Sequence, residues 1–182
     1  MNPIDLALAD VEYSFLHLEF AIKLMCYCEM GHLDIEKFDS DLTILLKHKN
    51  VGFPQGHFST PESVIHAAQA NVGVAFGVSA IALDSTFESA GIRNKIKSRA
   101  PIDELRTFVY MVRCAFAHNF ANPRWQINGP DFSRVFSLQL GSSIVSVDLS
   151  SLNGQEFEYS HIGDFAQWFS IKSAVIESVR SA

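Results

Sequence analysis

Several patterns that would identify a protein class are missing from this chain of 182 residues. It has only three cysteines, an odd number that fits a reducing compartment better than a disulfide framework. It contains no phosphate-binding P-loop, no dinucleotide-binding fingerprint and no nucleophile elbow. Its most apolar run, residues 72–83, is shorter than the roughly 20 residues that a membrane-spanning helix needs. Asp5 and Asp10 near the start argue against a signal or transit peptide. We therefore expect a soluble, cytoplasmic protein without membrane contact.

What the chain does have is apolar material, at 48% hydrophobic residues with 15 phenylalanines. This composition is enough to bury a sizeable core, and the length suits one domain over residues 1–182.

Helical periodicity dominates the pattern of apolar residues. Residues 4–30 place apolar side chains at alternating spacings of four and three, as one face of a helix does. Thr60, Pro61 and Glu62 form a strong start for a second long helix that ends near Gly91. Gly73 and Gly77, four residues apart, would let another helix approach this helix closely. Two more helices are expected, over residues 102–119 and 162–179.

The remaining segments are shorter. Residues 34–47 carry Phe38, Leu42 and Leu45 at helical spacing, which predicts a short helix, and residues 50–59 are expected to form a loop. Between about 124 and 159 the pattern changes to short β-type runs with a turn at 141–143. The predicted fold is therefore mainly α, a helical bundle with a small antiparallel β-hairpin inserted before the last helix.

The charge of the chain is unevenly distributed. The net charge is −6, yet residues 93–134 hold only three acids and eight bases, namely Arg93, Lys95, Lys97, Arg99, Arg106, Arg113, Arg124 and Arg134. We call this segment the basic segment. It could form a local phosphate-binding face, or its charges could simply be solvated and paired with acids elsewhere.

The stretch Arg113-Cys114-Ala115-Phe116-Ala117-His118-Asn119 is the strongest candidate for chemistry. Arginine offers a planar, permanently charged fork of donors for phosphate oxygens, and histidine exchanges protons near pH 7. On an ideal helix, the two residues lie about 140° apart with a rise of about 7.5 Å, so a shared site requires the arginine to curl round the helix or the helix end to distort.

This spacing resembles the R-x4-6-H motif of the HEPN family of small α-helical proteins, many of which are metal-independent ribonucleases of toxin–antitoxin and phage-defence systems. The resemblance implies a homodimer with two motif helices face to face, and a possible antitoxin-like partner. It implies that His118 transfers a proton at the ribose 2′-hydroxyl and that Arg113 stabilises charge on the phosphate, which gives a 2′,3′-cyclic phosphate. No metal or cofactor is expected. Additional contacts to RNA are expected from Asn119, Arg106, Arg124, Lys95, Lys97 and Arg99.

Other interpretations remain open for the same residues. HEPN nucleases usually carry a polar residue after the motif arginine, where this chain has Cys114, which favours a non-catalytic dimeric interaction or nucleotide-binding module. Arg113 could instead pair with an acid, and His118 or Asn119 could cap the helix end. Tyr110 could stack on a base, although a packed tyrosine is the simpler expectation.

Two further constellations are weaker. Cys26, Cys28 and His32 lack the fourth ligand that a structural zinc site needs, so buried thiols are expected there. Cys114 with His118 one turn away lacks a group to orient the imidazole, which a nucleophilic cysteine would require.

The motif helix is expected to be covered on two sides. Its low-charge second side, which would face another subunit, consists of Thr107, Met111, Cys114 and His118.

Overall fold

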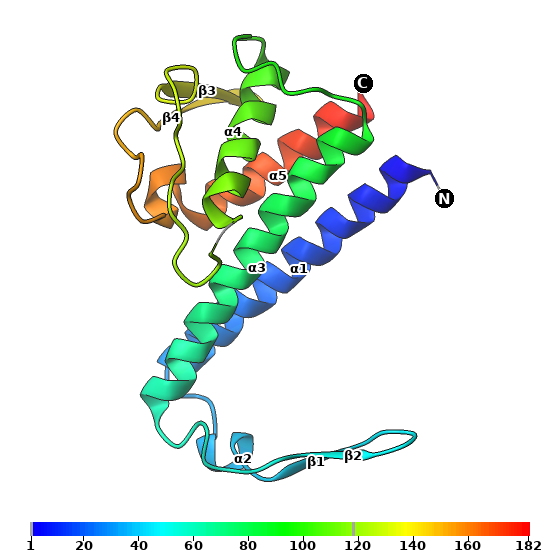
Figure 1. Ribbon diagram of the computed structural model, residues 1–182, viewed down its shortest axis with the longest axis vertical. Helices are drawn as coiled ribbons and strands as arrows, with labels where there is room; N and C mark the ends of the chain where they lie inside the picture. Colours follow the sequence, from blue (N-terminus) through cyan, green and yellow to red (C-terminus); the bar gives the residue numbers. More distant parts are fainter. Residues whose placement is uncertain (1, 118) are drawn as a thin grey trace.

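The computed structural model describes residues 2–117 and 119–182, and the long helices follow the apolar periodicity closely. Helix α1 spans Pro3–Glu29 and α3 spans Pro61–Ser89, and the two lie antiparallel along most of their length (Figure 1). Thr60 caps α3, since its side chain accepts a hydrogen bond from the Ser63 amide. Gly31, just beyond α1, has a φ of +69°, the left-handed conformation that favours glycine after a helix.

The remaining helices gather against one end of α3. Helix α4 spans Pro101–Phe116, a 3₁₀ turn spans Tyr159–Ile162, and α5 spans Asp164–Arg180 (Figure 1). Between α4 and the 3₁₀ turn lies an antiparallel hairpin of β3, Val135–Leu140, and β4, Ser143–Asp148. The prediction of a mainly α fold with a hairpin before the last helix is confirmed, with Arg124 and Glu156 adding an isolated bridge within the same region.

The main core lies where α3, α4, α5 and the hairpin meet. Phe76 of α3 is at its centre, with its ring centroid 4.9 Å from that of Trp168 and 5.2 Å from that of Phe116. The Trp168 indole donates a hydrogen bond of 2.9 Å to Ser79, so this buried polar group is satisfied. Burial of many aromatic rings stabilises the position of α4 against α3.

The segment between α1 and α3 differs from the prediction. Residues 34–47 form only one helical turn, α2, at Ile35–Phe38, and Leu42–Leu45 is instead strand β1. Residues 50–59 are not wholly a loop, because Asn50–Phe53 is strand β2, which pairs antiparallel with β1. The spacing of Phe38, Leu42 and Leu45 fits a helix, but alternate residues of the same run also fit a two-faced strand, and the paired ribbon is what forms.

This second hairpin projects from the far end of α1 and α3 as an arm (Figure 1). We call residues 39–58 the arm. Its base is fixed by carboxylates, because Asp39 accepts hydrogen bonds from the Gly56 and Phe58 amides and Asp41 accepts one from Gln55.

Helix α3 is long and apolar enough to cross a membrane by length and composition. In the fold, however, its inner side carries part of the core, including Phe76, Leu83 and the charged Asp84. A buried helix of a soluble protein passes the same test, and α3 is consistent with such a protein.

Candidate functional site

The motif arginine lies in the last turn of α4, beside Asp84 in the last third of α3. The helix ends at Phe116, earlier than expected, and residues 119–123, which we call the motif loop, form neither helix nor strand. Two glycines of α3 make room for this loop. A Cβ atom on Gly77 would lie 2.5 Å from the Phe120 ring, and one on Gly73 would lie 3.3 Å from the Phe120 carbonyl oxygen. The glycine pair therefore does permit a close approach, by the motif loop rather than by a whole helix.

A buried carboxylate on α3 organises the arginines of α4. Asp84 forms an ion pair with Arg106, and its other oxygen lies 3.9 Å from the Nε atom of Arg113. Arg106 is only 4% exposed, packs over the Phe87 ring, and has a second, longer contact of 3.7 Å with Glu88. Because a charge in such surroundings needs a partner, Asp84 and Arg106 stabilise each other where either would be costly alone.

Arg113 differs from Arg106 in being open to solvent. Its side chain is 41% exposed, although Asp84 restrains one edge of the guanidinium. An arginine that is held by a carboxylate and still exposed can present its remaining donors to an incoming phosphate. The contact with Asp84 is the acid pairing that the alternative interpretation of Arg113 expected, and it leaves the exposed donors of Arg113 available.

His118 lies outside the described residues. Asn119 directly follows it, and its side-chain oxygen accepts hydrogen bonds from the amides of Ala121, at 2.9 Å, and Asn122, at 3.1 Å. Asn119 therefore shapes the turn after the motif, while Ala117 occupies the helix end.

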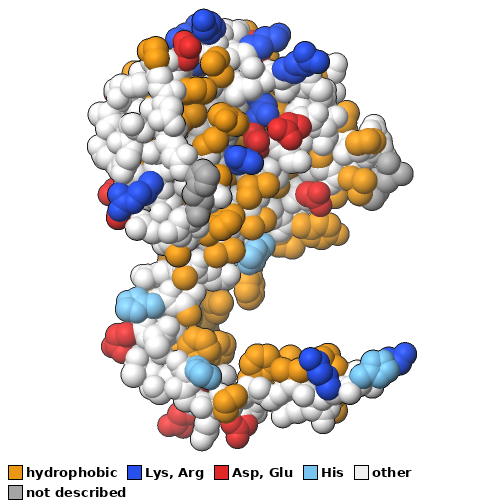
Figure 2. All heavy atoms as spheres, in the orientation of Figure 1, with side chains coloured by type: hydrophobic (Ala, Val, Ile, Leu, Met, Phe, Trp, Pro, Cys, Tyr) orange, Lys and Arg blue, Asp and Glu red, His pale blue; other side chains and the backbone are white. Residues whose placement is uncertain are grey.

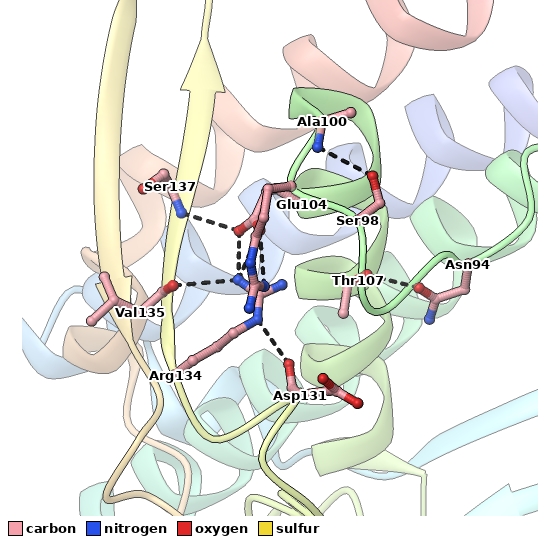
Figure 3. Close-up of polar contacts among 10 residues, drawn as sticks. Asn94, Ser98, Ala100, Glu104, Thr107, Asp131, Arg134, Val135 and Ser137 are labelled. Carbon is pink, nitrogen blue, oxygen red and sulfur yellow. Dashed lines mark hydrogen bonds and ion pairs between the residues drawn. The ribbon is translucent and has the colours of Figure 1, made fainter.

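Much of the basic segment is paired with acids of this chain. Buried Glu104 accepts hydrogen bonds from Arg134 and the Ser137 amide, and it thereby joins α4 to β3 (Figure 3). It also accepts one from Arg99. Exposed Arg124 pairs with Glu156 at 2.7 Å. Among the ion pairs of the described residues, none involves Lys95 or Lys97, which are exposed in the loop between α3 and α4.

An open pocket of about 570 Å³ lies between this loop and α4. Arg106, Tyr110 and Phe132 line one side of it, and Arg93 and Asn94 line the other. Tyr110 is half-buried and packs near Phe132, and a hydrogen bond with Cys114 raises the pKa of the Tyr110 hydroxyl above its usual value. The expectation of a packed tyrosine is confirmed, although part of the ring faces the pocket.

The second side of α4 is covered by the chain itself. Thr107 and Met111 are buried, Thr107 donates a hydrogen bond of 2.7 Å to Asn94, and Cys114 is half-buried. The expectation that Thr107 and Met111 face another subunit is therefore wrong, and on this side of the described helix the last turn, around Arg113 and Cys114, stays accessible.

The residues with metal-binding chemistry are dispersed. Among residues 2–117 and 119–182, no group of three histidine, cysteine or acidic side chains could hold a metal ion. Cys28 is buried, and this burial raises the pKa of its thiol. The prediction of buried thiols is confirmed for Cys28 and not for Cys26, which is half-buried.

Asp84 and Glu104, the two acids that order the arginines, were not predicted from the sequence. The signal for Asp84 was its position as the one acid in the long, largely apolar stretch between Glu62 and Glu88. An acid on such a helix requires a buried partner, which the sequence contains but does not identify. Comparison of this chain with protein-family models, curated proteins and solved structures finds no match, so its function has to be argued from this geometry.

Proposed function

We propose that this protein is a metal-independent RNA endonuclease of the HEPN type, acting as a homodimer in the cytoplasm in a toxin or phage-defence role. The observation that carries the proposal is the state of Arg113, which is restrained by Asp84 and 41% exposed at the end of the motif helix. Arg106, which shares the same carboxylate, is enclosed, so of the two arginines that Asp84 contacts it is Arg113 that can reach a substrate. An antitoxin-like protein is the partner that such a role implies.

The chemistry follows from the two motif residues. His118 takes the proton of a ribose 2′-hydroxyl, and the 2′ oxygen attacks the adjacent phosphorus. The bond between phosphorus and the 5′ oxygen breaks, the motif of the second copy protonates that leaving oxygen, and a 2′,3′-cyclic phosphate remains. Arg113 stabilises the negative charge that builds up on the phosphate oxygens. No metal ion takes part in these steps.

The RNA backbone is bound by the basic side chains that form no ion pair within the described part of the chain. Arg93, Lys95 and Lys97 lie together in the loop between α3 and α4, which also borders the pocket beside Tyr110. Arg99, Arg106 and Arg124 are already paired with acids and contribute less to phosphate binding than the sequence alone suggests.

The test is cleavage of mixed RNA in EDTA by wild type, His118→Ala and Arg113→Lys. Loss of a general acid or base lowers the rate by about 10²–10⁴-fold, and lysine cannot reproduce the bidentate fork of arginine. Arg180→Lys is the matched control, since Arg180 is exposed in the last turn of α5 and lies outside the basic segment. Cleavage that survives His118→Ala, or that falls equally in Arg180→Lys, would contradict the mechanism.

A second candidate is a non-catalytic dimeric module that binds a nucleotide or a partner protein. It is favoured by Cys114, whose thiol is engaged with Tyr110 directly beside Arg113. Here wild type would cleave no RNA, yet a nucleotide would quench tyrosine fluorescence, and Tyr110→Phe would weaken this signal. Saturable binding of the nucleotide, together with RNA that stays uncleaved, would favour this candidate over the nuclease.

A further inference from the structure

The arm carries an apolar stripe that nothing in the described chain covers. In the pairing of β1 with β2, Leu42 lies opposite Phe53 and Ile44 lies opposite Val51. Residues directly opposite each other in an antiparallel ribbon share a face, so these four side chains form one apolar face. All are exposed except Val51, which is half-buried. A two-stranded hairpin is marginally stable by itself, so such a face indicates a ribbon that packs on another surface.

Helix α1 has a second apolar face, opposite the one that enters the core. At 100° per residue, its exposed apolar side chains fall within about 80° of one another and about 180° from the buried Leu18. We call them the outer stripe of α1, made of Leu6, Tyr13, Leu16, Phe20 and Tyr27. Leu16 is 63% exposed and Phe20 is 61% exposed. Large apolar side chains that are exposed next to one another typically mark a surface that binds a partner.

Helix α3 continues this surface. Val74, Val78 and Ile81 are exposed within about 60° of one another on its outer side. A shallow groove joins the two helices, lined by Tyr13 and His17 from α1 and by Val78 and Ile81 from α3. Figure 2 shows apolar side chains along the arm and others on the body of the molecule that faces it. We call the open space between the arm and this part of the body the notch.

The charges around the two surfaces are complementary. The arm between Leu42 and Phe53 contains no acid, and its exposed tip carries Lys47, His48 and Lys49. Helix α1 carries one lysine and five acids, which are Asp5, Asp10, Glu12, Glu19 and Glu29. Helix α3 adds two exposed acids, Glu62 and Glu88, and no lysine or arginine, while its third acid, Asp84, is buried and paired with Arg106. A cationic arm tip is therefore attracted to the rim of the apolar helix face.

We propose that a second copy of this chain occupies the notch, and that the arm of each copy packs across the outer faces of α1 and α3 of the other. Each chain then supplies one arm and one receiving face, so a two-fold dimer covers both apolar surfaces at once. This inference rests on the homodimer of the proposed function and names its interface. The receiving face borders the motif, because Ile81 lies one helical turn from Asp84, which restrains Arg113.

The first experiment measures mass by sedimentation at micromolar concentration. Wild type should show twice the chain mass of 20.2 kDa. Ile44→Glu in the arm and Phe20→Glu in the outer stripe should each raise the dimer dissociation constant by at least about 30-fold, as loss of an interface hot spot does. The matched control for the arm is Thr43→Glu, on the opposite face of the same strand, and for the helix it is Ser170→Glu on α5. Both controls should remain dimeric.

Mixing the two variants separates arm exchange from any other dimer. Ile44→Glu has two damaged arms and Phe20→Glu has two damaged faces, but a mixed dimer retains one intact arm on one intact face. The mixture should therefore associate more tightly than either variant alone. A mixture that associates no better than its components would overturn the arm exchange.

The remaining outcomes identify other occupants. A monomeric wild type overturns the inference, and if that monomer floats with phosphatidylcholine vesicles, the apolar face is a membrane surface. A dimer that persists in both variants also overturns it and leaves the interface at the last turn of α4. RNA cleavage, measured on the same samples, is a separate readout. A dimer that depends on the arm but cleaves no RNA supports this interface and contradicts the proposed nuclease.

Discussion

The two ends of the paired helices α1 and α3 are stabilised by different interactions. At one end, α4, α5 and the β3–β4 hairpin bury a large aromatic core around Phe76. At the other end, the small cluster of buried residues consists of Cys28, Val64 and Ala68, and the arm leaves its apolar side chains exposed. One end is thus ordered by burial within the chain. The other is ordered by hydrogen bonds at the base of the arm and presents apolar surface to a partner.

The largest test of this contrast removes one phenylalanine from each end. Phe76→Ala should lower the free energy of unfolding by about 3–5 kcal/mol, because it leaves a cavity among rings that cannot collapse onto it. Phe53→Ala in the arm should change it by under about 1 kcal/mol at concentrations that keep the chain monomeric, because this ring is already half exposed. Urea denaturation followed by circular dichroism measures both. Equal losses would mean that the arm packs on its own chain.

A second test compares a buried ion pair with an exposed one. Asp84→Asn leaves the charge of Arg106 buried without its counterion and should destabilise the fold by about 3–5 kcal/mol. Glu156→Gln removes the exposed partner of Arg124 and should cost about 0–1 kcal/mol. Burial lowers the pKa of Arg106, but from a value so high that the group stays charged near neutral pH. Urea denaturation measures the free energy of unfolding of both variants. A loss of under about 1 kcal/mol in Asp84→Asn, as for an exposed pair, would show that water reaches the Asp84–Arg106 pair.

Two glycines give a smaller contrast. Gly77→Ala would place a methyl group against Phe120 and Phe116, and overpacking of this kind costs about 1–3 kcal/mol. Gly52→Ala in the arm meets no atom within 4 Å and should be close to neutral. Thermal unfolding measures the two variants side by side. A neutral Gly77→Ala would indicate that the motif loop is free to move away from α3.

The smallest effect concerns the start of α3 beside the arm. Thr60→Ala removes the side chain that accepts the Ser63 amide hydrogen, which should cost about 1 kcal/mol. Thr60→Ser keeps the hydroxyl and should recover most of this loss. Differential scanning calorimetry resolves the difference, and an unchanged melting temperature in Thr60→Ala would show that the cap does not limit the stability of this end.

The long helices could be predicted from the sequence because local signals agree on them. Thr60 and Pro61 start α3, and glycines follow the ends of α1 and α3. The arm could not be predicted, because Phe38, Leu42 and Leu45 satisfy a helical spacing while Leu42 and Ile44 satisfy a strand. Four residues are too few for periodicity to decide between the two, and the exposed surroundings of the arm offer no core to select a face.

The site was predictable in part for a related reason. Arg113 could be chosen from the type and spacing of the motif residues, since both are properties of local sequence. Its partner Asp84 lies 29 positions earlier on another helix, and Arg106, which shares that carboxylate, gives no local sign of being buried. The packing of α4 on α3 determines that Arg106 is enclosed and Arg113 is exposed, and this packing is not visible in the local sequence.

The carboxylate of Asp84 also has a mechanical consequence. It contacts two arginines of α4 from a single point on α3, and the exposed Ile81 lies one turn earlier, about 60° round the same helix. The carboxylate and the outer apolar surface therefore occupy neighbouring strips of one helix. A contact on Ile81 that slides or rotates α3 displaces the carboxylate, and the guanidinium of Arg113 moves with it.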